Sequence, residues 1–274
     1  MTTPNSRSMT RSVAMLGSRS VSVVLPTRNE ERNIGWVLER LPACVTEVVL
    51  VDSSTDRTVE VARALRDDVA VVRSYRRGKG AALCAGFARA SGDYVVALDA
   101  DGSMDPAEIE FYVAALDDGY QFAKGSRFLP GGGSLDLTKI RTLGNRALLS
   151  AVNSMWRVAL TDLCYGYFAF QRACLPTLAP TAPGFEIEAE LVVHALSARL
   201  RMAEVPSVEL ARQYGMSNLH AWRDGNRILR TVLHERLSAR APRRVVHALD
   251  TAAVRRVPHP ALGARVDQPI RGLA

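Results

Sequence analysis

Two aspartates, Asp99 and Asp101, follow a short apolar run and are separated by a single residue. Side chains two positions apart in a strand point the same way, so at a strand end these carboxylates would face one site. Hard cations such as Mg²⁺ are held by one or two carboxylates, while phosphate oxygens and waters complete the shell. The spacing therefore fits a metal–phosphate site. It also fits a structural arrangement in which one aspartate caps a helix and the other is solvated, although Asp105 is well placed for that capping.

A second chemical feature is the basic stretch Arg76-Arg77-Gly78-Lys79-Gly80, which precedes an amphipathic segment. Backbone N–H groups at a helix N-terminus, together with a lysine, can attract an anion. No Ser or Thr follows the lysine and the glycine spacing is not GxGxxG, so neither a Walker A loop nor a dinucleotide-binding loop is indicated. A tight turn with a solvated basic flank remains the alternative. Asp52 also follows an apolar run and can either contact a nucleoside or cap a helix.

Short apolar runs alternate with amphipathic segments from residue 21 onward, which predicts alternating strands and helices. Strands are expected at Val21–Leu25, Thr46–Val51, Val69–Arg73, Tyr94–Leu98 and Gln121–Gly125. Helices are expected at Glu30–Leu41, Val59–Leu65, Gly78–Ala90 and Pro106–Leu116. Further along we expect helices at Lys139–Trp156, Glu186–Leu200 and Leu219–Leu233, a strand near Tyr165–Phe170 and an extended segment at Arg201–Arg212.

This alternation predicts an α/β fold with a mostly parallel, Rossmann-like central sheet flanked by helices, because a parallel return needs a crossover long enough for a helix. Such sheets bind ligands at the carboxyl ends of their strands. The polar segments 27–30, 52–56, 76–79 and 99–105 should therefore gather at one edge. We expect a single domain over residues 21–236, preceded by a flexible basic segment (1–20) and followed by a basic, disordered tail (237–274).

The composition is that of a globular protein, with 274 residues, 47% hydrophobic and 23% charged, and it excludes a wholly disordered or fibrous chain. The formal net charge of +7 resides in the two ends, since residues 1–20 carry three arginines and no acids and residues 237–274 carry seven arginines and two acids. The arginines lack interleaved aromatic residues, which argues against nucleic-acid binding. Four scattered cysteines are expected to be reduced thiols.

No apolar run reaches the roughly 18 residues needed to span a bilayer, and the first twenty residues lack the apolar core of a secretory signal. We therefore expect a cytoplasmic protein. The basic ends can hold it as a peripheral protein against an anionic membrane surface, or they can be solvated tails.

In combination, the motifs resemble those of family 2 glycosyltransferases with the GT-A fold, and most closely the dolichyl- or polyprenyl-phosphate mannose synthases. The resemblance extends over residues 21–233 and depends on the order of its motifs. In the first half these are Val23–Glu30, Val51–Asp56, Gly78–Gly80, Gly92–Tyr94 and Asp99–Asp101. In the second half they are Gly125–Arg127, Asp162 with Gly166 and Tyr167, Gly184–Glu186, Val205–Pro206, and Arg212 followed by Gly215–Leu219.

The resemblance implies a UDP- or GDP-sugar donor and a Mg²⁺ or Mn²⁺ ion held by Asp99 and Asp101. The donor-binding residues that it implies are Pro26, Thr27, Asn29, Glu30, Asp52, Lys79, Asp99, Ala100, Asp101 and Arg127. The implied acceptor-binding residues are Arg141, Glu188, Arg212 and Ser217. The implied catalytic residues are Asp101, Arg127, Asp162 and Arg212.

The leading hypothesis is a metal-dependent, inverting transfer to a polyprenyl phosphate. A hydroxyl acceptor on a small molecule, glycan or protein is the alternative, and it would need a carboxylate base, for which Asp162 is the first candidate and Glu188 the second. A sugar nucleotidyltransferase would share the layered fold, but Pro26–Glu30 lacks that class's glycine-rich loop. Departures from the mannose synthase pattern, such as Asn218 where a lysine is common, leave the sugar and the acceptor open.

Overall fold

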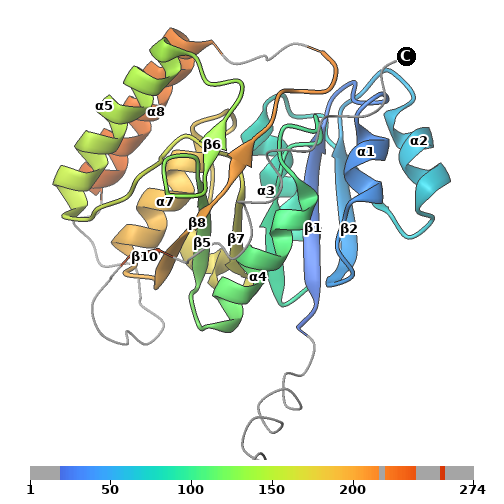
Figure 1. Ribbon diagram of the computed structural model, residues 1–274, viewed down its shortest axis with the longest axis horizontal. Helices are drawn as coiled ribbons and strands as arrows, with labels where there is room; N and C mark the ends of the chain where they lie inside the picture. The colour runs from blue at the N-terminus through green and yellow to red at the C-terminus, as the bar shows by residue number, and fades with distance from the viewer. Residues whose placement is uncertain (1–18, 216–219, 239–253, 257–274) are drawn as a thin grey trace, which may run out of the picture.

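Eight strands form the central sheet of the computed structural model, which describes residues 19–215, 220–238 and 254–256 (Figure 1). Across the sheet the order is β10 (Arg255–Arg256), β8 (Met202–Pro206), β5 (Phe122–Ser126), β7 (Phe168–Gln171), β4 (Tyr94–Ala97), β1 (Val21–Thr27), β2 (Val45–Asp52) and β3 (Ala70–Arg73). Strand β7 runs antiparallel to β4 and β5, and the other pairings are parallel. The mostly parallel sheet expected from the sequence is confirmed.

The central strands are apolar on both faces because helices cover both sides of the sheet. In β1, Val23 and Leu25 pack into one core layer, whereas Val24 packs into the other, and all three are fully buried. The alternation follows from the pleat, which points successive side chains to opposite faces. A continuous run of β-branched and aliphatic residues is therefore what this position in the sheet requires.

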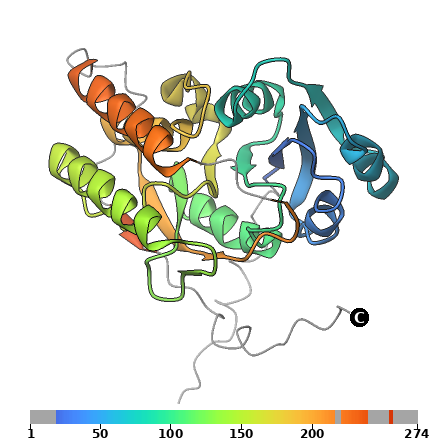
Figure 2. The ribbon, with the colours of Figure 1, turned by 90° about the horizontal axis from the view of Figure 1, so that it is seen from above.

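Helices α1, α2 and α4 cover one face of the sheet, and α3 and α7 cover the other (Figures 1 and 2). Their bounds are α1 Ile34–Glu39, α2 Thr58–Leu65, α3 Lys79–Arg89, α4 Ile109–Asp117, α5 Lys139–Trp156, α6 Leu175–Leu178, α7 Ile187–Ser197 and α8 Ala221–Ser238. The long helices α5 and α8 lie side by side and both contact α7. They form an outer layer at the β8 end of the molecule.

A second sheet of two short strands, β6 (Gly133–Ser134) and β9 (Val208–Glu209), lies above the carboxyl edge of the central sheet. An isolated bridge joins Glu209 to Met104, which lies in the loop after β4. Strand β9 lies within the extended segment expected at Arg201–Arg212, whereas β6 was not expected, because a two-residue strand leaves no periodic pattern in the sequence. The bridge to Met104 places Glu209 against the loop that also contains Asp99 and Asp101.

The elements differ from expectation mainly at their ends. Strand β4 ends at Ala97, so Asp99 and Asp101 lie in the following turn and the expected two-residue strand alternation does not apply to them. The helix expected at 30–41 is regular only over Ile34–Glu39. Asp105 does cap the next helical segment, since its carboxylate accepts the N–H of Ala107.

Two described elements extend beyond residue 236, where the sequence suggested the domain would end. Helix α8 continues to Ser238, and Arg255–Arg256 pair with β8 as an edge strand. The remainder of the expected tail, and all but the last two residues of the expected N-terminal segment, lie outside the described residues. None of the helices in the described part of the chain is long and apolar enough to cross a bilayer.

Candidate functional site

A pocket of about 250 Å³ opens at the carboxyl ends of the parallel strands. Segments following β1, β2, β3 and β4 contribute to its wall, as the sequence predicted, and the opposite wall comes from residues 164–166, α7, β9 and the start of α5. Ten of the expected site residues line it: Pro26, Thr27, Glu30, Lys79, Asp99, Ala100, Asp101, Arg141, Glu188 and Arg212.

Lys79 occupies the floor of the pocket between two carboxylates. Its ammonium group lies 2.7 Å from Asp99 and 2.8 Å from Glu188, and only 10% of its side chain is exposed. Gly166 makes this arrangement possible, because a Cβ at that position would lie 2.5 Å from Lys79 Nζ and 2.6 Å from Glu188 Oε1. Burial alone would lower the pKa of Lys79, but its two carboxylate partners raise it, so the ammonium stays charged.

Asp99 is held in a strongly anionic neighbourhood. Burial raises the pKa of Asp99 to about 6, Lys79 opposes this shift, and Asp101 and Glu188 add to it. A carboxylate whose charge is disfavoured by burial and by like charges is stabilised by an additional cation. The arrangement therefore favours binding of positive charge at this point of the pocket.

Asp101 and Glu30 share the guanidinium of Arg212. Arg212 NH2 forms an ion pair with Asp101 Oδ2, and its NH1 lies 3.6 Å from Glu30 Oε1. The second oxygen of Asp101 accepts the backbone N–H of Ser103 at 2.9 Å. Burial raises the pKa of Glu30, and the neighbouring Asp101 contributes to the shift. Arg212 is therefore the cation that holds these two carboxylates together.

The donor set around Asp99 and Asp101 fits a hard divalent cation. Both side chains line the same pocket and offer oxygen ligands, which Mg²⁺ and Mn²⁺ prefer. Two carboxylates alone make an incomplete shell, as expected where diphosphate oxygens supply further ligands. Asp99 and Asp101 would hold such an ion.

The basic loop before α3 differs from the simple anion cradle considered from the sequence. Gly78 has a φ of +115°, and the first turn of α3 packs so closely on residues 182–184 that a Cβ on Gly80 would lie 2.0 Å from the carbonyl oxygen of Ala182. The N–H of Ala81 donates to the carbonyl oxygen of Pro183. The loop thus contributes Lys79 to the pocket, while its backbone anchors the α3 terminus.

Two expected donor residues, Asp52 and Asn29, do not line the pocket. Asp52 is fully buried, accepts the Thr27 hydroxyl at 3.0 Å and pairs with Arg73, so it orients Thr27. Asn29 accepts the N–H of Thr55 at 2.9 Å, and its own N–H donates to Ser54. Asn29 therefore connects the loop after β1 to the loop after β2, and it lines a separate hollow that Arg212 also lines.

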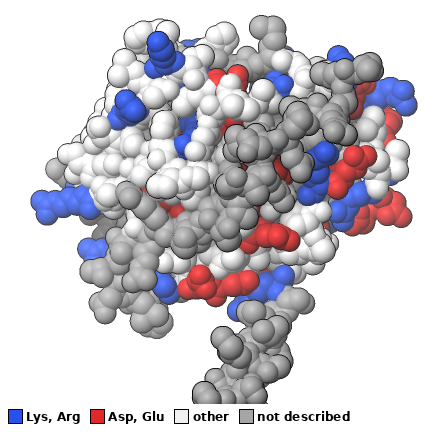
Figure 3. Space-filling view, viewed as in Figure 1, with Lys and Arg blue, Asp and Glu red and all other residues white. Residues whose placement is uncertain are grey.

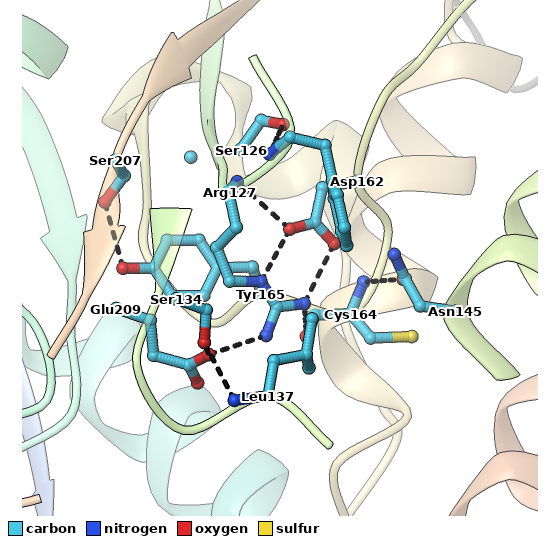
Figure 4. A network of polar contacts seen from close by, with 12 residues as sticks. Ser126, Arg127, Ser134, Leu137, Asn145, Asp162, Cys164, Tyr165, Ser207 and Glu209 are labelled. Carbon is cyan, nitrogen blue, oxygen red and sulfur yellow. Dashed lines mark hydrogen bonds and ion pairs between the residues drawn. The ribbon is translucent and has the colours of Figure 1, made fainter. Parts of the chain in front are cut away.

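Arg127 and Asp162 form a buried pair (Figure 4), and neither residue lines the pocket. The guanidinium of Arg127 donates to both oxygens of Asp162, at 2.8 and 3.0 Å, and also to Glu209 and to the carbonyl oxygen of Cys164. Burial alone would raise the pKa of Asp162, but its hydrogen bonds to Arg127 lower it. Asp162 is thus placed poorly for a general base. Arg127 stabilises the pocket wall through its hydrogen bonds to Glu209 and to the carbonyl oxygen of Cys164.

Arg141 and Glu209 form the wall below the first turn of α5. Arg141 donates to Asp136 at 3.2 Å, and its NH2 lies 3.9 Å from Glu209 Oε1. Glu209 also contacts Arg127, so it links the buried pair to the pocket. The expected acceptor residue Ser217 lies outside the described residues.

Several pocket residues were missed from the sequence. Ser53 lies in segment 52–56, which the strand-end rule placed at this edge without assigning the serine a role, and the same rule could have found Ser74, which follows β3. Glu209 and Asp136 belong to irregular or very short segments and left no signal. Cys164 also lines the pocket, but burial raises the pKa of its thiol to about 12, so it is not a thiolate nucleophile.

Comparisons with known proteins agree with this geometry. A sequence model described as Glycosyl transferase family 2 matches residues 22–178. A polyprenol monophosphomannose synthase of Mycolicibacterium smegmatis is 31% identical over 211 residues, which are 72% of this chain and 80% of that protein. A low-salt glycan biosynthesis hexosyltransferase of Haloferax volcanii is 31% identical over 226 residues, 78% of this chain, and the chain spans only about half (53%) of that relative.

A solved structure is similar over most of the fold. Glucosyl-3-phosphoglycerate synthase from Mycobacterium tuberculosis, in complex with Mn²⁺, UDP-glucose and phosphoglyceric acid, has a TM-score of 0.65 and 28% sequence identity. The similarity covers 80% of each chain. That complex contains a divalent metal, a nucleotide sugar and a phosphate-bearing acceptor, the three classes of ligand for which the pocket described above has charged partners.

Proposed function

Because this chain belongs to glycosyl transferase family 2 and has the GT-A fold, we propose that it transfers a sugar from a UDP- or GDP-linked donor to a polyprenyl phosphate, with inversion at the anomeric carbon. Membership of the family makes it a glycosyltransferase. The choice of acceptor depends mainly on one observation: an exposed apolar and basic surface lies next to the pocket.

The donor half of the proposal follows from the strand-end wall. Pro26, Thr27 and Glu30 would face the nucleoside, and Asp99 and Asp101 the metal and diphosphate. A bound Mg²⁺ or Mn²⁺ ion would neutralise charge on the departing diphosphate. The M. tuberculosis synthase, which was solved with Mn²⁺ and UDP-glucose, supports this orientation.

The reaction needs little proton chemistry if the acceptor is a phosphate. An acceptor phosphate oxygen would form a bond to the anomeric carbon as the bond from that carbon to the donor diphosphate breaks, and the nucleoside diphosphate would leave with the electron pair. Attack from the opposite face inverts the anomeric configuration. Arg141 and Arg212 would hold the acceptor phosphate in line, which is the positioning that such a displacement requires.

A lipid acceptor is favoured by helices α5 and α8, whose surface is apolar and basic. Ile140 and Leu143 on α5 are 63% and 71% exposed, and Trp222 and Leu237 on α8 are 82% and 70% exposed. Helix α5 contains no acidic residue, and its third residue, Arg141, lines the pocket. The apolar side chains therefore begin where the acceptor would enter.

The charged residues of α8 also leave a basic outer surface. Its two acids, Asp224 and Glu235, are turned inward, with 3% and 17% of their side chains exposed, whereas Arg223 and Arg227 are more than half exposed. In Figure 3 the end of the molecule formed by α5 and α8 is mainly white and blue, while red and blue mix around α1 and α2. Exposed apolar residues among arginines are typical of helices that lie on an anionic membrane surface. We therefore propose peripheral contact with the cytoplasmic face of a membrane.

Transfer to a hydroxyl of a phosphorylated small molecule is the second candidate, and the similarity to glucosyl-3-phosphoglycerate synthase favours it. It requires a base within reach of the hydroxyl. Glu188 lines the pocket and is the better placed carboxylate, although Lys79 pairs with it at 2.8 Å. Asp162 is fully buried against Arg127, which weakens the role first suggested for it.

Product analysis separates the two candidates. Thermal-shift measurements with UDP and GDP plus Mn²⁺ would first identify the nucleotide from ligand-linked stabilisation. The purified protein would then be supplied with labelled donor sugars and with either a short polyprenyl phosphate or 3-phosphoglycerate, and products analysed by mass spectrometry. We expect a glycosyl phosphate lipid of inverted configuration. Transfer only to the hydroxyl compound would overturn the lipid assignment.

A further inference from the structure

A second group of ionisable side chains lies between α7 and α8, and none of its members lines the pocket. Glu190 and His194 are one turn apart on α7, and Glu235 reaches them from α8. One ligand atom from each residue lies within 4.8 Å of the other two. A residue spacing of four places Glu190 and His194 on the same helix face, so both are directed toward the neighbouring helix.

The imidazole of His194 is oriented from both sides. Its Nδ1 faces the carbonyl oxygen of Leu178, and its Nε2 lies 2.7 Å from Glu235 Oε2. A carbonyl oxygen only accepts hydrogen bonds, so Nδ1 must carry a proton, which directs Nε2 toward the two carboxylates. Histidines that bind metals are commonly held in this way, with one ring N–H donating to a backbone carbonyl while the other nitrogen coordinates.

Glu190 is also fixed in a manner suited to a ligand. Its carboxylate accepts the N–H groups of Thr181 and Ala182 at 3.0 and 2.9 Å and the Thr181 hydroxyl at 2.8 Å. These three bonds use three of the four lone pairs that a carboxylate offers and leave one for another partner. The side chain is therefore positioned before anything binds.

The charges of the group do not balance without a cation. Glu190 is only 2% exposed, and within residues 19–215, 220–238 and 254–256 no lysine or arginine forms an ion pair with Glu190 or Glu235. A proton on His194 Nε2 offsets one carboxylate and leaves the other uncompensated in a buried interface, which is unfavourable. A divalent ion would offset both charges at once.

We propose that Glu190, His194 and Glu235 bind a divalent transition-metal ion, Zn²⁺ being the best match to one imidazole nitrogen and two carboxylates. Tetrahedral Zn²⁺ holds such ligands about 2.0–2.2 Å away, which separates them by about 3.3 Å. His194 Nε2 and Glu235 Oε2 are 2.7 Å apart and all three ligand atoms lie within 4.8 Å of one another, so side-chain rotations can bring them to that spacing. Glu235, 17% exposed, leaves an entry path. The ion would link α8, which carries part of the proposed membrane-binding surface, to α7.

The test uses full-length protein without an affinity tag. The protein carries Asp101→Asn, which removes a metal ligand from the nucleotide pocket and so prevents zinc from binding there. The protein is stripped with a chelator, equilibrated with Zn²⁺ alone, passed through a desalting column and assayed for bound zinc by mass spectrometry. We expect about one equivalent of zinc and a rise in Tm of about 5–10 °C at a hundredfold excess over Kd. Substitution with Co²⁺ should give the visible absorption of a tetrahedral site.

Variants of the cluster decide whether the zinc is bound there. In the same background, E235Q changes a ligand at the edge of the group while keeping its size, and H194Q removes the imidazole. Each should lower zinc affinity at least about tenfold and abolish the Co²⁺ spectrum, whereas H234Q, a change at the exposed histidine next to Glu235, should retain both. The proposal is overturned if the Asp101→Asn protein retains no zinc, or if E235Q retains as much as H234Q. Either result leaves the proposed glycosyl transfer unaffected.

Discussion

The buried pair of Arg127 and Asp162 gives the most direct test of how the site is built. Asp162 is fully buried, Arg127 is 5% exposed, and two charge-assisted hydrogen bonds of 2.8 and 3.0 Å join them. Changing Asp162 to Asn keeps the shape but leaves the guanidinium without its main counter-charge. Removing one partner of a buried ion pair costs about 3–5 kcal/mol. We expect Asp162→Asn to lower the free energy of unfolding by that amount.

The measurement is urea unfolding at pH 7, followed by far-UV circular dichroism, together with the transfer rate of the folded fraction. Asp67→Asn, at an exposed aspartate, is the matched control and should change stability by less than about 0.5 kcal/mol. The double variant Arg127→Met/Asp162→Leu should lose less stability than the two single changes combined, because the two facing charges are removed together and Glu209 keeps Arg141 at 3.9 Å. If Asp162→Asn has native stability and loses transfer only to a hydroxyl acceptor, Asp162 is a base and the reasoning fails.

The same pair predicts a dependence of stability on pH. Burial would raise the pKa of Asp162, but the hydrogen bonds and charge of Arg127 outweigh it and lower the pKa below the ordinary value of 3.8. An acid with a lowered folded-state pKa stabilises the protein above its unfolded pKa and loses that contribution as the pH falls through the folded value. Between pH 7 and pH 3 the wild type should therefore lose more stability than Asp162→Asn, and equal losses would contradict the lowered pKa.

Three further results follow from the pocket and its surroundings. Gly166→Ala places a methyl group 2.5 Å from Lys79 Nζ and should reduce transfer at least tenfold in a kinetic assay, whereas Gly144→Ala, which has open space, should not. Asp101→Asn, or chelation of divalent metal, should abolish transfer while the circular dichroism spectrum stays native; turnover that persists in EDTA would contradict metal dependence. Leu143→Glu on α5 should weaken co-sedimentation with anionic liposomes severalfold without changing Tm, and unchanged binding would remove α5 from the membrane contact.

The sheet and its carboxyl edge could be predicted from the sequence because both depend on local patterns. Apolar runs such as Val48–Val51 clearly indicate strands that are buried on both faces of a sheet. Polar residues directly after parallel strands must converge at the carboxyl edge of that sheet. That rule alone brings Thr27, Lys79, Asp99 and Asp101 to one pocket. It also explains why strand ends were less well predicted, since Asp99 and Asp101 reach the pocket from a turn and not from the strand.

The remaining parts of the site depend on contacts between segments that are distant in sequence. Glu209 enters the pocket only because a two-residue strand pairs with Gly133–Ser134, and such a strand has too few residues to show a period. The sequence likewise could not reveal that the guanidinium of Arg127 donates its hydrogen bonds to Asp162 and Glu209. A single arginine gives the same sequence signal whether it binds a phosphate or a buried carboxylate. Family resemblance identified the residue, and the structure located its partners.

The pocket explains why charge composition was a poor guide to function. Two of the cations on its wall are already paired with carboxylates, Lys79 with Asp99 and Glu188, and Arg212 with Asp101 and Glu30. A diphosphate that arrived alone would meet these carboxylates, and a metal that arrived alone would compete with Arg212 for Asp101. If metal and donor bind together as proposed, Asp99 and Asp101 would hold the metal, and Arg212 would become free to contact phosphate. On this proposal the paired charges would favour joint binding of metal and donor over binding of either alone.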